Sequence, residues 1–323
     1  MKKYSSISIK LLMGVCTLCL LFSFGCNDDV DLPAQPLEQY MKVYMPQAVN
    51  NPVNLVFSMS DTGSNVIYGA DYGGPNAPKE DIKVQFDVNA ALIDSFNTAN
   101  GTDYPILPEG TYAFEETSAI IAKGALSTAP LHLHLTTMGD GGVPPLKTFI
   151  LPVQLSGASF TINPALQTTF YVITVQPDRA DYPDYDKSGW KIIDFSSQEI
   201  NGEHAPATNA IDGDPATFWH SQWSGAAPVP PHYITIDLGE IKPLHGVELL
   251  ARQADGSGKP QNVTIEVSDD NVHWSDAADL VFQNTQNLQQ SFLSGFTEGR
   301  YVKVIVNTAF NASYTQIAEF NLF

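Results

Sequence analysis

A short stretch in the second half of the chain carries most of the residues whose types could do chemistry. Asp212, Asp214 and Thr217 lie within six positions, and the intervening Gly213 and Pro215 favour a tight, non-helical turn. Such a turn points several oxygens inward, as a hard cation such as Ca²⁺ requires. An EF-hand loop is excluded, because its third acidic position and its distal glutamate are missing. The turn predicts a calcium site, with an ordinary acidic surface turn as the alternative.

Aromatic and imidazole groups follow this turn directly. Trp219, His220 and Trp223 would place flat apolar rings beside a group that can form hydrogen bonds. This combination suits a sugar ring. We expect Trp219 in the core, whereas Trp223 is either a binding residue or a second core aromatic.

The overall composition limits the classes of ligand. The chain has 323 residues, enough for about two domains, and its 35 acidic and 16 basic residues give a net charge of −19. This balance argues against nucleic acid and anionic membrane surfaces as partners, and is compatible with neutral ligands and metal cations. The 22 Pro, 23 Gly, 13 Tyr and 17 Phe, with few long helical patterns, favour β structure.

The N-terminus has the pattern of a signal peptide. Three lysines precede an apolar run over 11–24, which is short for a membrane span. The sequence then resembles a bacterial lipobox, with Cys26 as the lipidated first residue of the mature chain. After cleavage Cys26 is the only cysteine left, so it has no disulfide partner. A plain secretory signal is the alternative.

These features predict a lipid-anchored protein of the outer membrane. The acidic residues 27–31 resemble a tag that sends some Gram-negative lipoproteins to the cell exterior. We therefore expect a signal peptide over 1–25, a lipid anchor as the only membrane contact, and a polar tether over 26–39.

The next part of the chain, 40–176, is predicted to be an antiparallel β-sandwich that carries one short helix. Between 88 and 104 the apolar period becomes helical, with Asn89 as the cap and Gly101 as the end. His132 and His134 share one face of a strand, as a metal pair or, more simply, as part of a solvent-facing surface. Strands are predicted from apolar–polar alternation at 53–59, 83–88, 118–121, 131–135, 149–155 and 168–175.

Several short motifs in this part resemble a known domain. They are Ile93-Asp94-Ser95-Phe96-Asn97, Gly101-Thr102-Asp103-Tyr104, Leu151-Pro152-Val153 and Ile162-Asn163-Pro164. This region resembles the N-terminal domain of unknown function found in glycan-utilisation lipoproteins of Gram-negative bacteria. The resemblance implies a structural or binding module without known catalytic residues.

A charged, proline-bearing linker over 177–185 precedes a second β unit at 186–323. Alternation predicts antiparallel strands at 233–238, 247–250, 263–268 and 301–306. The matching motifs run from Ala210-Ile211-Asp212-Gly213-Asp214 to Ala318-Glu319-Phe320. This unit resembles the discoidin, or coagulation factor 5/8 type C, family, whose fold is shared with family 32 carbohydrate-binding modules. The resemblance implies a jelly-roll sandwich, and the whole chain is predicted to be all-β.

The resemblance also implies a structural calcium site. Ca²⁺ would be held by the turn and by the last strand, and carboxylates with neutral oxygens suit it better than Zn²⁺ or Mg²⁺. The implied side-chain ligands are Asp212, Asp214, Thr217 and Glu319. The implied backbone carbonyls are those of Asn209 and Ala318.

A carbohydrate site is implied on the loops at one end of this sandwich. Trp223 would stack on a pyranose, His220 and Arg252 would donate hydrogen bonds, Glu203 would accept one, and Tyr314 would form a second wall. Such a set suits galactose-type sugars. Arg252 could instead be an ordinary surface ion-pairing residue. The segment 254–260 departs from the family pattern and leaves the exact sugar open.

Taken together, these features predict a non-catalytic surface lipoprotein that binds glycans, for polysaccharide capture, with other glycan-utilisation surface proteins as possible partners. A protein-binding adhesin is the alternative. A glycosidase is not expected, because it needs two carboxylates at a set separation in a cleft, and neither predicted sandwich offers an obvious one.

Overall fold

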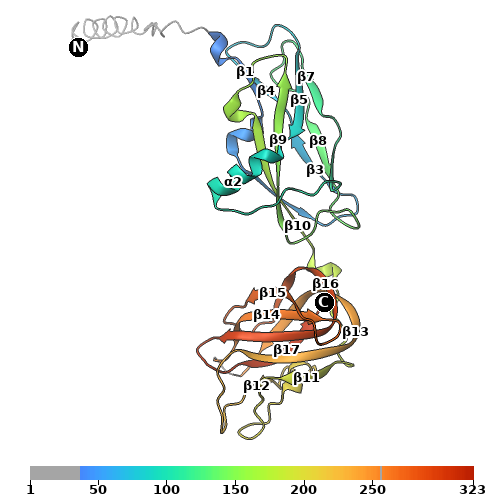
Figure 1. The fold of residues 1–323 in the computed structure, drawn as a ribbon, viewed down its shortest axis with the longest axis vertical. Coiled ribbons are helices and arrows are strands. Elements are labelled where there is room, and N and C mark those ends of the chain that lie inside the picture. Colours follow the sequence, from blue (N-terminus) through green and yellow to red (C-terminus); the bar gives the residue numbers. More distant parts are fainter. Residues whose placement is uncertain (1–36, 255–256) are drawn as a thin grey trace, which may run out of the picture.

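A computed structural model describes residues 37–254 and 257–323 (Figure 1). Two β domains follow one another along the long axis of the molecule. Their hydrophobic cores are separate, one drawn from positions 43–175 and the other from positions 190–322. The predicted signal peptide, the lipidation at Cys26 and most of the tether lie outside the described residues. Within the described residues, no helix has the length and apolar character needed to span a bilayer.

The first domain contains a five-stranded sheet in the order β2-β10-β9-β5-β7, a three-stranded sheet in the order β3-β8-β6, and the pair β1-β4. Its strands are β1 (Lys42–Tyr44), β2 (Val53–Ser58), β3 (Ser64–Tyr68), β4 (Asp71–Gly73), β5 (Ile82–Val88), β6 (Tyr112–Phe114), β7 (Ser118–Ile121), β8 (Leu131–Leu135), β9 (Thr148–Ala158) and β10 (Thr168–Gln176). The six predicted strands are confirmed, and the four additional ones are short.

Alternating side chains build the core of this domain between the two larger sheets. In β5 every second residue from Ile82 to Phe86 is buried, and in β8 the leucines are buried while His132 and His134 lie on the opposite face. The Tyr68 ring meets the Phe86 ring edge-on at 5.1 Å. The histidine pair is therefore part of a partly exposed strand surface, as the simpler interpretation held.

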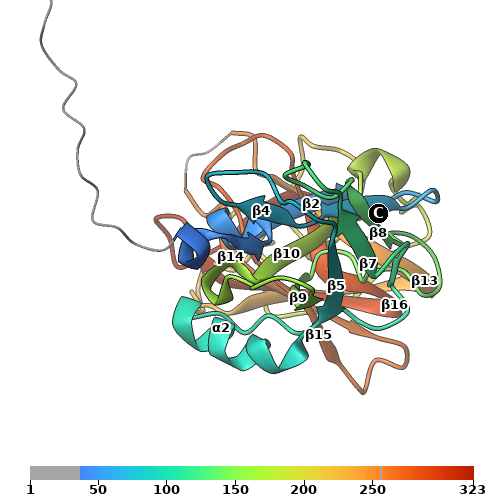
Figure 2. The same cartoon turned by 90° about the horizontal axis from the view of Figure 1, so that it is seen from above.

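The predicted helix is present and lies outside the five-stranded sheet (Figures 1 and 2). It comprises a 3-10 turn, Ala90–Leu92, and α2, Ile93–Asn100. The Asn89 side chain caps the start by accepting from Ala91 N at 3.2 Å. Gly101, with φ of 65°, ends the helix in the left-handed conformation that glycine adopts without strain. Phe96 anchors the helix on the sheet.

One strand pair differs from the antiparallel prediction. β2 runs parallel to β10, from Val53 beside Tyr171 to Ser58 beside Gln176. Parallel neighbours need a long connection between them, and here the rest of the domain supplies it. Alternation within a strand does not encode its direction relative to its neighbour, so the sequence pattern did not reveal this pair.

The segment between the domains lies against the second one. The Arg179 guanidinium donates to Glu248 Oε1 at 3.0 Å and lies 3.7 Å from the centroid of the Phe323 ring. The Tyr182 ring lies 4.3 Å from that of His245, and its hydroxyl contacts Met59 Sδ of the first domain at 3.6 Å. The predicted linker is thus bound to the second domain by charge and by ring contacts.

The second domain contains a seven-stranded sheet in the order β12-β17-β13-β16-β14-β15, with β11 paired to β13. Its strands are β11 (Lys191–Phe195), β12 (Trp219–His220), β13 (His232–Ala251), β14 (Pro260–Ser268), β15 (Ser275–Val281), β16 (Gln289–Ala309) and β17 (Gln316–Leu322). Short 3-10 turns in the two domains occur at Leu37–Tyr40, Pro46–Asn50, Pro164–Leu166, Arg179–Asp181 and Ala207–Ala210.

Two long strands fold this sheet into a sandwich. β13 and β16 span 20 and 21 residues, and their pairing shifts register between Asp237 and Lys242 and again between Leu244 and Gly246. Such irregularities bend strands and let each contribute to both layers. All four predicted strands are confirmed as parts of β13, β14 and β16.

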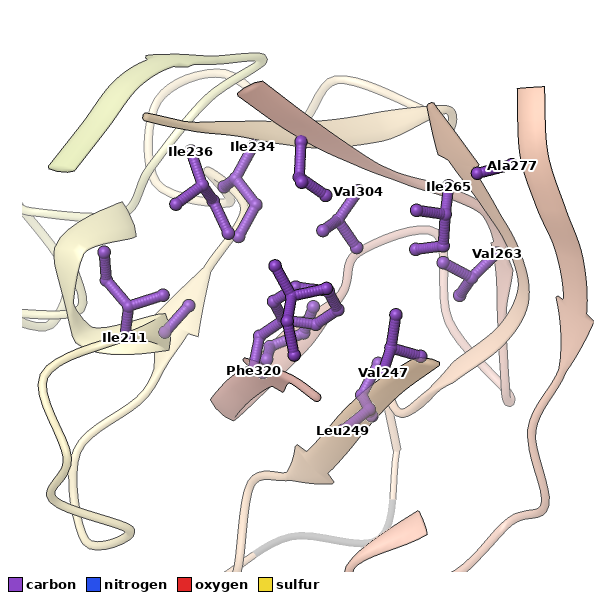
Figure 3. Packing of buried hydrophobic residues seen from close by; sticks show 14 of the residues in the cluster. Ile211, Ile234, Ile236, Val247, Leu249, Val263, Ile265, Ala277, Val304 and Phe320 are labelled. Atoms are coloured by element: carbon purple, nitrogen blue, oxygen red, sulfur yellow. The ribbon is translucent and has the colours of Figure 1, made fainter. Parts of the chain in front are cut away.

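The core between the layers is apolar (Figure 3). Ile234, Ile236, Val247, Leu249 and Phe320 are fully buried in it. Each such side chain contributes roughly 1.5–3 kcal/mol relative to its exposed state. Trp219 is also fully buried, which confirms its predicted core position. This core supports the loops at the β12 end of the domain.

Candidate functional site

The five predicted sugar-binding residues converge on loops at one end of the second domain. Glu203 follows β11 in the loop before the 3-10 turn, and Trp223 follows β12. Arg252 lies just beyond the end of β13, and Tyr314 precedes β17. The antiparallel pairing of β12 with β17 brings His220 beside Gln316. Segments more than 100 positions apart in the sequence therefore share one surface.

Glu203 is the centre of this group. Its Oε1 accepts a hydrogen bond from Trp223 Nε1 at 3.3 Å and lies 3.7 Å from His220 Nε2. Its Oε2 lies 3.7 Å from Arg252 Nη2. The carboxylate is thus held from three sides while remaining partly exposed. A partly exposed carboxylate in a rigid frame is suited to accept hydrogen bonds from ligand hydroxyls.

Trp223 is a surface residue and not a core aromatic. It is 46% exposed. A Cβ added to Gly202 would lie 2.5 Å from ring atoms Cζ2 and Cη2, so the loop backbone is packed against the indole. The loop backbone supports the ring while leaving nearly half of the side chain open to solvent. An exposed aromatic surface beside hydrogen-bonding groups is the arrangement on which a pyranose can stack.

His220 lies beneath the surface, in contrast to its expected role as a direct hydrogen-bond donor to a ligand. It is 4% exposed and its ring stacks on Tyr314 with centroids 4.9 Å apart. Its Nδ1 lies 2.5 Å from Ser221 O, and its Nε2 faces Glu203. Burial lowers the pKa of His220 despite the carboxylate nearby. Both ring nitrogens face protein oxygens, so in this conformation the imidazole packs beneath Tyr314 and beside Glu203.

Arg252 lies among the predicted sugar-binding residues and also forms an ion pair, so it has features of both roles that the sequence left open. It approaches Glu203 as an ion-pairing residue, and its guanidinium lies 4.0 Å from the centroid of the Phe218 ring. Its Nε is buried without a hydrogen-bond partner. The Tyr314 hydroxyl lies 2.6 Å from Ser257 Oγ, and the role of Tyr314 as a second wall of a sugar site stays a prediction. Ser257 belongs to the segment in which no polar contact was foreseen.

Two residues of this region were missed by sequence reasoning, Glu199 and Gln316. With its amide oxygen facing the site, Gln316 accepts from Arg252 Nη1 at 3.0 Å, and the same oxygen lies 2.9 Å from His220 Nε2. Glu199 is fully buried and accepts four backbone hydrogen bonds. The available signal was its position just before Asn201-Gly202, a turn pair whose N–H groups need an acceptor.

The acidic turn forms as predicted. Thr217 Oγ1 donates to Asp212 Oδ2 at 2.7 Å, and Asp214 N donates to Asp212 Oδ1 at 2.9 Å. Asp214 Oδ1 accepts from Ala216 N at 3.0 Å. The Asn209 side chain donates to Phe218 O at 3.3 Å. Asp214 is thus turned toward its own loop.

The last strand brings a second carboxylate toward this turn. Leu250 pairs with Glu319 and Ala251 with Ile317, so Ala318 is the extra residue of a β-bulge. Glu319 Oε1 is buried without a partner, and its Oε2 contacts the Lys187 ammonium. Burial raises the pKa of Glu319, and the nearby Asp212 carboxylate raises it further.

The oxygens of this turn and of the last strand partly meet the requirements of Ca²⁺. Carboxylate oxygens of Asp212 and Glu319, a hydroxyl and backbone carbonyls are the oxygens that this ion prefers, and the orphaned Glu319 oxygen is consistent with a cation. Asp214 does not converge with them. Among the described residues, no group of three or more His, Cys, Asp or Glu side chains is arranged to hold a metal. The types of these donor atoms fit Ca²⁺. The Lys187 ammonium contacts one of the two Glu319 oxygens.

Comparison with known families adds to this geometry. Residues 192–320 match the family model for the F5/8 type C domain. The second domain matches the F5/8 type C family. Residues 38–161 match a family model described as an N-terminal domain. Both of the resemblances inferred from the motifs are therefore confirmed, and the all-β, sandwich character of the F5/8 type C-like domain agrees with the strands described above.

Curated relatives match this chain over part of their length. A sialidase of Micromonospora viridifaciens is 29% identical over 136 residues, 42% of this chain and 21% of that protein. A lacto-N-biosidase of Bifidobacterium bifidum is 28% identical over 252 residues, 74% of this chain and 21% of that protein. A galactose oxidase of Gibberella zeae is 30% identical over 143 residues, which are 42% of this chain and 20% of that protein. The chain spans about a fifth of the length of these relatives.

Solved structures are also similar to this chain. The C-terminal domain of a chitobiase from Bacteroides fragilis is 27% identical and covers 44% of this chain and 97% of its own, with a TM-score of 0.40. A family 32 carbohydrate-binding module from Clostridium perfringens in complex with galactose is 19% identical, covers 43% and 96%, and has a TM-score of 0.39. A two-domain protein with unknown function from Bacteroides fragilis is 15% identical, covers 99% and 100%, and has a TM-score of 0.35.

Proposed function

We propose that this chain is a non-catalytic surface lipoprotein that binds glycans through its second domain. The observation that carries the proposal is Trp223, a supported and 46% exposed indole whose N–H is bonded to the partly exposed Glu203 carboxylate. The ring offers an apolar surface for a pyranose, and Glu203, Arg252 and Tyr314 border it with polar groups. This is the composition of a small polar-ligand site.

The family match and the curated relatives support this function. The F5/8 type C match falls on the domain that carries the site, and the relatives are a sialidase, a lacto-N-biosidase and a galactose oxidase, all named for sugars. A shared part of about a fifth of each relative fits an accessory binding module better than a catalytic domain. We therefore propose binding without turnover.

Galactose-type sugars are the proposed ligand class. A hydroxyl perpendicular to the mean ring plane can reach a carboxylate–arginine pair while the opposite ring face stacks on Trp223. Such a site buries one or two sugar rings, so we expect a weak interaction, with a dissociation constant about millimolar or somewhat below, or roughly 4 to 6 kcal/mol. Many lipid-anchored copies on a cell surface would strengthen capture of a repeating polysaccharide.

Calcium has a structural role in this proposal. Asp212, Thr217 and Glu319, with the carbonyls of Asn209 and Ala318, would hold it, and Asp214 would join after its side chain turns. The ion would tie the acidic turn to β17. The same strand carries Gln316, so the turn and the sugar-binding loops would be supported by one element.

Titration calorimetry on the mature chain tests the function. The probes are galactose, N-acetylgalactosamine and galactose-containing oligosaccharides. Trp223→Ala should abolish measurable binding, because it removes the stacking surface while its backbone N–H, which bonds to Glu199, remains. Arg252→Ala should weaken binding with the fold intact. Trp274→Ala is the matched control, because Trp274 lies against Lys303, away from these loops.

Two results would reject the proposal. The first is no binding by the wild-type chain to these sugars or to a broad glycan array, in which case a protein-binding adhesin becomes the leading function. The second is wild-type affinity in Trp223→Ala. Release of reducing sugar that one carboxylate substitution abolishes would instead show an enzyme.

A further inference from the structure

We infer that Glu199 is a positioning residue that holds two loops of the sugar-binding region together and so sets the places of Trp223 and Glu203. The inference rests on the proposed function, because it concerns the same site. Glu199 itself is fully buried and would not touch a ligand.

Each oxygen of the Glu199 carboxylate joins two neighbouring backbone groups. Oε1 accepts from Asn201 N at 2.8 Å and from Gly202 N at 2.7 Å. Oε2 accepts from Trp223 N at 2.9 Å and from Ser224 N at 2.6 Å. One oxygen therefore binds the loop after β11, and the other binds the loop after β12, where Trp223 is 24 positions beyond Glu199.

The negative charge of Glu199 is satisfied by these amides. A carboxylate that accepts several backbone N–H groups is favoured in its ionised form, and these bonds lower the pKa of Glu199 to about 2. His220 is near enough for this charge to affect its own pKa. Glu199 therefore stays ionised through the physiological pH range, and the connection between the loops is permanent.

The backbone groups that bond to Glu199 belong to, or adjoin, the residues of the sugar-binding region. Gly202 N is bonded to Glu199, and the Gly202 backbone lies against the Trp223 ring, whose own N is bonded to the other oxygen. Glu203 is the next residue after Gly202. The Glu199 backbone adds to this frame, because its N donates to His220 O at 2.8 Å and its O accepts from Ala205 N at 2.9 Å. A shift of either loop would thus move the indole relative to the Glu203 carboxylate.

A glutamine in place of Glu199 would not reproduce this arrangement. A glutamine at this position keeps the size of the side chain, but its amide nitrogen is a donor and would face two N–H donors. Two backbone groups would then lose their acceptor in a buried place, which is costly. A partly disordered pair of loops must become ordered on binding, and this lowers affinity.

The first experiment combines hydrogen exchange with binding on the full mature chain. Glu199→Gln is compared with wild type and with Glu240→Gln, a control at an exposed carboxylate of the same domain. In Glu199→Gln we expect faster amide exchange at Gly202, Trp223 and Ser224, with unchanged protection in β14 and β16. We expect galactose-containing oligosaccharides to bind at least about ten-fold more weakly, the loss that corresponds to about 1.4 kcal/mol.

The outcomes separate this inference from the proposed function. Local loosening with weaker binding supports both. Local loosening in a chain whose wild type binds no sugar supports the connection between the loops and rejects the function. Unchanged exchange at the three amides, or wild-type affinity despite faster exchange, overturns the positioning role. A uniform loss of protection across β14 and β16 also overturns it, because Glu199 would then support the whole domain.

A second measurement needs no variant. The chemical shift of the Glu199 side-chain carboxyl carbon, Cδ, reports on this group alone and not on the neighbouring Glu203. In wild type it should stay constant as pH is lowered through about 4.5, the ordinary pKa of a glutamate, and should change only toward about 2. A titration of this carbon with a midpoint near 4.5 would contradict the bonded and ionised carboxylate.

Discussion

The Trp223 indole lies against the backbone of Gly202, so closely that an added Cβ would fall 2.5 Å from two ring atoms. The φ angle of Gly202 is not positive, so alanine can adopt the same backbone conformation. The role of this glycine is close approach to the ring. The indole can therefore lie where it does only because residue 202 has no Cβ.

Gly202→Ala should displace the Trp223 ring and weaken sugar binding by about ten-fold or more, because stacking depends on the place of the ring. Stability should change little, since the displaced ring is partly exposed. Calorimetry with a galactose-containing oligosaccharide and near-ultraviolet circular dichroism measure the two effects. Gly295→Ala is the control, because a Cβ there meets open space and its φ is also not positive. Equal affinity of Gly202→Ala and Gly295→Ala would contradict the assignment.

Calcium binding is predicted to raise the melting temperature of the second domain, because a ligand that binds only the folded state stabilises it by mass action. Chelator should lower the transition, and Asp212→Asn should remove the difference between the two conditions. Elemental analysis of the purified chain provides the complementary measurement. An unchanged melting curve in excess chelator, with no bound metal, would reject the calcium site.

Lys187 offers a more specific test of the same site. Its ammonium contacts Glu319 Oε2 and so competes with a cation for that carboxylate. Lys187→Met should lower the melting temperature without calcium, because Glu319 loses its counter-charge beside Asp212. The same variant should show a larger rise in melting temperature when calcium is added. If calcium stabilises the variant and wild type equally, Lys187 does not compete with the cation for Glu319.

Arg179 is predicted to stabilise the second domain although it belongs to the segment between the domains. Arg179→Ala would leave Glu248, whose side chain is 8% exposed, without its cation, and would remove the contact with Phe323. Arg179 itself is partly solvated, so we expect a loss of about 2 kcal/mol, less than for a fully buried pair. Chemical denaturation measures it. Glu240→Gln, at the exposed carboxylate that pairs with Lys242, should change stability little and serves as the control.

Acylation of Cys26 remains a prediction from the sequence. Mass spectrometry of the mature N-terminus should find a lipidated cysteine as the first residue, and the protein should fractionate with the outer membrane. Cys26→Ser should abolish lipidation and leave the signal peptide uncleaved, so the protein should be lost from the outer-membrane fraction. An unmodified Cys26, or cleavage at another residue, would show an ordinary secretory signal.

Local pattern alone determined much of this protein. Alternation located the strands at the cores of both domains, Asn89 and Gly101 marked the ends of the helical segment, and the spacing of Asp212 and Thr217 predicted their turn. These features depend on neighbours in the chain, and each is present in the structure. The apolar character of Trp219 and its position between turn and strand were likewise sufficient to assign it to the core.

Only the tertiary structure decided the details of the site. The sequence could not reveal that Glu199 is buried among four N–H groups, that His220 lies beneath Tyr314, or that a bulge at Ala318 brings Glu319 toward Asp212. Each of these depends on strand register and on loops that meet from distant parts of the chain. A carboxylate has the same letter in a sequence whether it faces water or backbone amides, and the surrounding fold decides which of these roles it has.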